Sequence, residues 1–72
     1  MNNSKNKYLE QNIDRLDVEI KITDILKANK IKKIKELCKL SKTDLKEMDI
    51  KQKESEKIQI ELQLLGLDLR NG

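Results

Sequence analysis

Residues 58–69 read IQIELQLLGLDL and carry the clearest helical pattern in the chain. Ile58, Leu62 and Leu65 stand at positions i, i+4 and i+7, which places them on one face of a helix. Gly66 comes directly after them, where a residue with left-handed backbone commonly ends a helix, and the leucine that follows is the usual hydrophobic closure. We therefore expect the longest helix of the protein to end at Gly66.

Upstream of this stretch, a first helix is expected over residues 20–29. Ile22, Ile25 and Leu26 are spaced i, i+3 and i+4, so they share one helical face. Asn29 follows them and is one of the few residue types that adopt left-handed backbone readily, so we expect it to end this helix.

Two further short helices are expected between these elements. Apolar residues recur at helical spacing over residues 31–38, and Ser41 with Asp44 forms a Ser-x-x-Asp cap signature for a third helix. Asp49 is placed to cap the start of the last helix. We expect the core of the resulting bundle to bury six aliphatic side chains: Leu26, Ile34, Leu37, Leu45, Ile58 and Leu62.

Composition supports an all-α fold and a single small domain. The chain has 72 residues, of which 36% are hydrophobic and 40% charged, with no proline, two glycines and one aromatic residue, Tyr8. Tight β-hairpins need turn residues that are scarce here. The first residues are polar, so we expect a flexible arm over residues 1–12 and a folded domain over residues 13–70. We expect Tyr8 to pack against the edge of the fold.

Catalytic and metal chemistry find no support in the residue types present. The chain has one cysteine, Cys38, and no histidine, so neither a disulfide nor a usual zinc ligand set is expected, and Cys38 has no imidazole base. Asp14, Asp17 and Glu19 lack the glycine and alternating ligands of a calcium loop. We expect no enzyme activity, cofactor, metal or small-molecule substrate, and a buried structural thiol at Cys38.

Charge is concentrated in the middle of the sequence. The net charge is +3, but residues 27–42 contain seven lysines and only one carboxylate, Glu36. Such a patch can attract nucleic acid or an acidic protein, or it can simply solvate exposed helix faces. The longest uncharged run is too short to span a bilayer, and no signal peptide is recognisable, so we expect a cytoplasmic protein without membrane contact.

The order of these patterns resembles the C-terminal domain of the bacterial RNA polymerase α subunit. The resemblance covers residues 13–70, with one residue fewer near Glu47 to Asp49, and rests on these residues: Leu16-Asp17-Val18, Ile25-Leu26-Lys27, Ile31, Ile34, Glu36-Leu37, Asp44-Leu45, Ile58, Leu62 and Leu65-Gly66-Leu67-Asp68-Leu69. It implies a compact bundle of four short helices, with a helix-hairpin-helix-like turn between the third and fourth. Because the chain opens with a polar segment from Met1, we expect a divergent, free-standing version, with a truncated α subunit as the alternative.

The resemblance also implies a site for the minor groove of A/T-rich DNA. The arginine that the family uses corresponds to Lys21, which keeps the charge but not the planar guanidinium fork. The asparagine three residues later corresponds to Asp24, whose carboxylate opposes phosphate. The family's Gly-x-Lys-Ser turn reads Lys51-Gln52-Lys53-Glu54 here, so the lysine is kept while the glycine and serine are lost. The family's glutamate corresponds to Lys57.

Two functions remain open at this point. The first is a small transcription-related module that binds DNA weakly and with little sequence specificity through Lys21, Lys51, Lys53 and Lys57. The second is a protein-interaction module that contacts RNA polymerase or a transcription regulator without binding DNA.

Overall fold

The computed structural model describes residues 6–71, and this part of the chain is all-α, as expected. No strand occurs within it; the only sheet-like pairing there is a single antiparallel bridge between Asn12 and Lys33. Two short 3-10 helices precede four α-helices: η1 (Lys7–Glu10), η2 (Ile13–Arg15), α1 (Ile20–Ala28), α2 (Ile34–Leu37), α3 (Lys42–Glu47) and α4 (Gln52–Leu64). None of these helices is long and apolar enough to cross a membrane.

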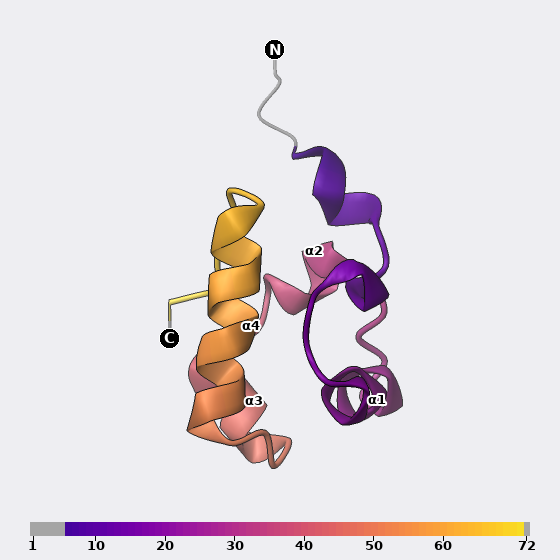
Figure 1. Ribbon diagram of the computed structural model, residues 1–72. Coiled ribbons are helices and arrows are strands. Elements are labelled where there is room, and N and C mark those ends of the chain that lie inside the picture. Colours follow the sequence, from indigo (N-terminus) through magenta and orange to yellow (C-terminus); the bar gives the residue numbers. More distant parts are fainter. Residues whose placement is uncertain (1–5, 72) are drawn as a thin grey trace.

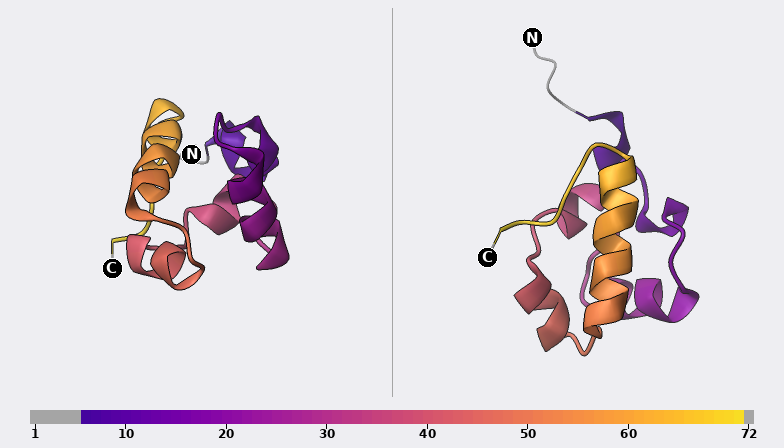
Figure 2. Two further views of the ribbon diagram at one scale, coloured as in Figure 1. Left: turned by 60° about the horizontal axis from the view of Figure 1, so that its bottom comes forward. Right: turned by 60° about the vertical axis from the view of Figure 1, so that its left-hand side comes forward.

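The four α-helices form a small bundle around α2. Figure 1 shows α4 along one side of the molecule, α1 and the N-terminal 3-10 helices along the other, and α2 between them. Helix α3 lies beside the first turns of α4, and a tight turn over residues 48–51 joins the two (Figure 2). This turn between α3 and α4 therefore brings the start of the longest helix to one end of the molecule.

The core is aliphatic and lies where the helical spacing predicts. All six side chains expected to be buried together have no exposed surface. Five further hydrophobic residues complete this core and were not among the six expected to be buried together: Ile13, Leu16, Ile22, Ile50 and Leu69. Ile13 enters the core from η2, and Leu69 enters it from the segment after α4. The segments before α1 and after α4 are therefore held to the bundle by burial of apolar surface.

Three helices end in the same backbone motif. At the end of α4, Leu67 N–H donates to Leu62 O (2.8 Å) and Gly66 N–H donates to Gln63 O (3.0 Å), while Gly66 has φ +79°. This is the Schellman arrangement, which satisfies carbonyl groups that the helix leaves free. The prediction that Gly66 ends the last helix with left-handed backbone is confirmed.

Helices α1 and α3 repeat this motif without glycine. Lys30 (φ +68°) and Asp49 (φ +66°) occupy the left-handed position, and the following isoleucines donate to Leu26 O and Leu45 O. Asn29 is the C-cap residue of α1, as expected, but with φ −98° it is not left-handed. The prediction that Asp49 caps the start of α4 was wrong, because Asp49 follows the end of α3 and the N-cap residue of α4 is Lys51.

Replacing Lys30 by glycine should raise the free energy of unfolding by about 1 kcal/mol, because left-handed backbone costs an L-residue about 1–2 kcal/mol and costs glycine almost nothing. The matched control is Ala28→Gly, two residues earlier and inside α1, where glycine should lower stability by up to about 1 kcal/mol. Urea denaturation of both variants measures the difference. A loss of stability in both would contradict the left-handed assignment at Lys30.

The start of α3 is capped as predicted. Asp44 N–H donates to Ser41 Oγ (3.2 Å) and Ser41 N–H donates to Asp44 Oδ2 (2.9 Å), which is a capping box. The hydrogen bond from the Ser41 backbone is the main cause that lowers the pKa of Asp44. Arg70 pairs with the same carboxylate at 3.0 Å, so the segment after α4 is tied to α3.

The folded unit begins earlier than the expected boundary at residue 13. Asn6 Nδ2 donates to Leu65 O (2.7 Å), Ile34 N–H donates to Gln11 O (2.9 Å), and Tyr8 is half-buried against the core. The expectation of a flexible arm is therefore corrected for residues 6–12, which pack on α2 and on the end of α4. Residues 1–5 of that arm lie outside the described residues. The expectation that Tyr8 packs at the edge of the fold is confirmed.

Candidate nucleic-acid interface

The start of α4 carries three of the four predicted DNA-binding lysines. Lys51 is the extended residue before the helix, and Lys53 and Lys57 stand four residues apart on one face of it. No side chain caps this helix end. The positive end of the α4 dipole therefore lies among these lysines and adds to their attraction for an anion.

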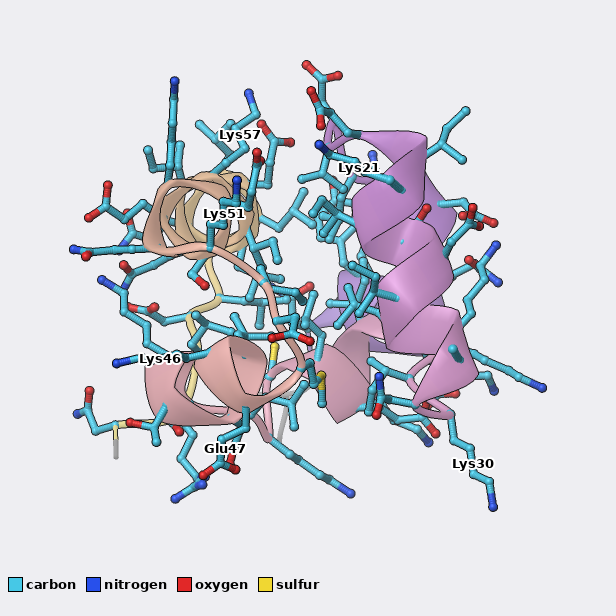
Figure 3. All side chains as sticks on the ribbon, turned by 90° about the horizontal axis from the view of Figure 1, so that it is seen from below. Lys21, Lys30, Lys46, Glu47, Lys51 and Lys57 are labelled. Atoms are coloured by element: carbon cyan, nitrogen blue, oxygen red, sulfur yellow. The ribbon has the colours of Figure 1, made fainter. Side chains whose placement is uncertain are left out.

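The fourth residue, Lys21, comes from the first turn of α1. Figure 3 shows Lys21, Lys51 and Lys57 on the same side of the molecule, where α1 and α4 both begin. Because residues 21 and 57 are far apart in sequence, this arrangement depends on how the two helices pack. The structure thus brings the predicted residues to one surface.

Carboxylates share this surface with the lysines. A hollow of about 420 Å³ lies between residues 17–19, just before α1, and the first turns of α4. Its lining includes both signs of charge: Asp17, Val18, Glu19, Lys53, Glu54 and Lys57. Asp24 is also exposed, one helical turn after Lys21. The surface is consequently mixed in charge and repels phosphate at several points.

Two of the four lysines have carboxylate partners. Lys21 Nζ lies 3.4 Å from Glu19 Oε1, and Lys57 Nζ lies 3.6 Å from Glu61 Oε2. The first pair is more than 60% exposed on both sides, so it contributes little to stability and can open when an anion approaches. Lys51 and Lys53 have no ion pair with any residue between 6 and 71. They are the most available cations of the set.

Glu61 is a residue that the sequence patterns did not single out. Its side chain is only 14% exposed, and besides Lys57 it accepts a hydrogen bond from Asp17 N–H at 3.1 Å. Glu61 therefore holds the segment before α1 against α4 and sets the relative position of Lys57 and Lys21. No signal within the sequence pairs residues 44 positions apart.

No protein-family model matches the chain, and no curated protein matches it at a significant level.

Some lysines of the segment 27–42 form ion pairs and others do not. Lys27 pairs with Asp14 at 2.7 Å, and Glu10 pairs with both Lys33 (3.4 Å) and Lys35 (3.0 Å). The hydrogen bond from Lys35 is the main cause that lowers the pKa of Glu10. Three of the seven lysines in this segment thus hold the N-terminal segment in place. Four of its lysines have no ion pair within residues 6–71: Lys30, Lys32, Lys39 and Lys42.

The remaining singled-out residues lie apart from this surface. Cys38 is half-buried, not fully buried as expected, and desolvation raises the pKa of its thiol. A raised pKa keeps the thiol protonated and unreactive.

Within residues 6–71, no three His, Cys, Asp or Glu side chains are grouped closely enough to hold a metal ion. Two cationic side chains flank the half-buried Tyr8, with Arg15 4.4 Å from the ring centre.

Proposed function

We propose that this protein is a small transcription-related module that binds DNA weakly, with little sequence specificity, through Lys21, Lys51, Lys53 and Lys57. The observation that carries the proposal is the unpaired positive charge of Lys51 and Lys53 at the uncapped start of α4. Phosphate is attracted there by two lysines and by the helix dipole together.

The surface chemistry accounts for the expected weakness. Lysine contacts phosphate as a point charge and lacks the fork with which arginine recognises a narrow minor groove. Asp17, Glu19 and Glu54 line the adjoining hollow and repel the backbone of a duplex. Binding of this kind depends on charge and hardly on sequence. The link to transcription comes from the resemblance to the RNA polymerase α subunit domain.

Binding of a short A/T-rich duplex should weaken steeply as salt is added. Each neutralised phosphate contributes about −0.9 to the log–log slope, so three or four lysine contacts predict a slope of about −3. Lys53→Ala should weaken binding and reduce the slope by about one unit, and Asp24→Asn should strengthen binding by removing a carboxylate. Fluorescence anisotropy over a series of NaCl concentrations measures all three.

The matched control is Lys30→Ala, since Lys30 is an exposed lysine on the opposite side of the molecule (Figure 3). It should leave the slope unchanged. If the wild-type protein binds no duplex at low salt and Asp24→Asn does not restore binding, the DNA proposal fails.

The second candidate function is a protein-interaction module that contacts RNA polymerase or a transcription regulator. The mixed charge of the hollow favours it, because Asp17 and Glu19 oppose DNA but can pair with basic groups of a protein. Titration of ¹⁵N-labelled protein with RNA polymerase, read at residues 17–24 and 51–57, tests this alternative. Signal loss there without any response to DNA would favour it over DNA binding.

A further inference from the structure

A second hollow lies on a different side of α4, between that helix and α3. It has a volume of about 410 Å³, and its lining residues come from α3, from the turn after it and from the start of α4: Lys42, Thr43, Lys46, Ile50, Lys51, Gln52 and Ser55. Lys42 and Lys46 stand four residues apart on α3 and form one wall. The opposite wall is Lys51 with the first turns of α4.

This hollow is positively charged without compensation from its own lining. Three lysines line it and no carboxylate does. None of the three has an ion pair with any residue between 6 and 71. Of the acidic residues nearby, Asp44 is paired with Arg70, and Figure 3 shows Glu47 farther from α4 than Lys46. Asp49 borders an adjoining hollow that shares Lys46, Ile50 and Lys51 with this one. Asp68 is close enough to Lys42 for that lysine to contribute to lowering the pKa of its carboxyl.

The floor of the hollow is mostly apolar and is formed by the side chains of Ile50 and Ser55. Ile50 and Ser55 are each only 2% exposed, and both line this space. The aliphatic stems of the lysines extend the apolar surface upward, as long basic side chains commonly do. The hollow therefore offers a non-polar floor under a rim of three ammonium groups.

We infer that this hollow binds an acidic segment of a partner protein, with one apolar side chain of that segment over Ile50 and flanking carboxylates on Lys42, Lys46 and Lys51. Charge complementarity selects the carboxylates, and burial of a central apolar side chain supplies an anchor. A nucleic acid fits less well, because no aromatic ring lines the hollow for a base to stack on and a phosphate backbone leaves the floor unused. This inference does not depend on DNA binding by Lys53 and Lys57.

The probe is the acidic pentapeptide Ac-Glu-Asp-Leu-Asp-Glu-amide, titrated into ¹⁵N-labelled full-length protein. Amide shifts should appear at Thr43, Ile50 and Ser55, with a dissociation constant of about 0.1–1 mM, as expected for a short flexible ligand. Lys46→Glu should weaken binding at least about tenfold, because it replaces an attraction by a repulsion. The same peptide with alanine in place of leucine should bind about three- to tenfold more weakly.

The charge-matched control is Lys30→Glu, at an exposed lysine remote from the hollow, and it should change the affinity less than about twofold. Equal losses in Lys30→Glu and Lys46→Glu would overturn the inference, since binding would then follow net charge alone. Equal affinity of the leucine and alanine peptides would overturn it as well. So would a short duplex that shifts Thr43, which lies on α3 outside the proposed DNA site, more strongly than the peptide does, because the hollow would then belong to nucleic acid.

These outcomes separate this inference from the DNA proposal. A protein that fails to bind the duplex yet binds the peptide at Thr43 and Ser55 retains the hollow and loses only the proposed function. Lys53 lies outside the lining, so Lys53→Ala should leave peptide affinity within about twofold, while Lys46→Glu should weaken it at least about tenfold even though Lys53 is intact.

Discussion

Leu62→Ala should lower the free energy of unfolding by about 2–5 kcal/mol, the range for removing a leucine side chain from a well-packed core. Leu62 has no exposed surface, and its carbonyl also accepts the hydrogen bond from Leu67 N–H that closes α4. A domain of this size is stabilised by only about 4–10 kcal/mol in total. The variant should therefore be partly unfolded at room temperature, which circular dichroism and urea titration will show.

The control for this prediction lies on the same helix. Leu64 is 75% exposed, so Leu64→Ala deletes the same atoms from the surface and should change stability by less than about 0.5 kcal/mol. Similar losses in both variants would mean that α4 is rotated about its axis relative to this structure.

Gly66→Val should lower the free energy of unfolding by about 1–2 kcal/mol or more. Gly66 has φ +79°, and a β-branched residue adopts this region with considerable strain. A Cβ atom at this position would meet Asn6 Nδ2 at 3.5 Å, an ordinary contact. The loss should therefore come from the backbone conformation and not from a steric clash, and thermal unfolding measures it.

Two controls separate these causes. Gly66→Asn should recover much of the stability, because asparagine tolerates left-handed backbone, and Gln63→Ala on the exposed face of α4 should do little. Equal destabilisation by valine and asparagine would instead point to the side chain, and so to crowding against Asn6.

The sequence predicted the four lysines of the candidate site, but it did not predict all the carboxylates that lie beside them. The i, i+4 spacing of Lys53 and Lys57 places them together on any α-helix, and the resemblance added Lys21 and Lys51. The partners of these lysines lie elsewhere in the sequence. Glu61 is recognisable as an i+4 partner of Lys57, but its bond to Asp17 N–H exists only because the segment before α1 packs on α4. Asp17 and Glu19 likewise line the hollow beside the first turns of α4 only because this segment packs on α4.

The hollow between α3 and α4 had a partial signal in the sequence. Lys42 and Lys46 are four residues apart within a short helix, so their shared face was recognisable. Lys51 joins them only because the turn over residues 48–51 reverses the chain and because Ile50 folds beneath it. Helical spacing says nothing about a residue in a turn, which is why Ile50 was also absent from the expected core.

The sequence by itself determined the four α-helices, the capped start of α3, the end of α4 and six of the eleven core residues. Apolar spacing, the Ser41–Asp44 cap and Gly66 act within a few residues, so short segments specify them without help from the rest of the chain. Only the tertiary structure decided that residues 6–12 pack on α2 and that three lysines of segment 27–42 pair with Glu10 and Asp14. Such contacts join residues more than ten positions apart. Their formation depends on the packed arrangement of the helices, because an isolated surface charge gains little from any one partner in water.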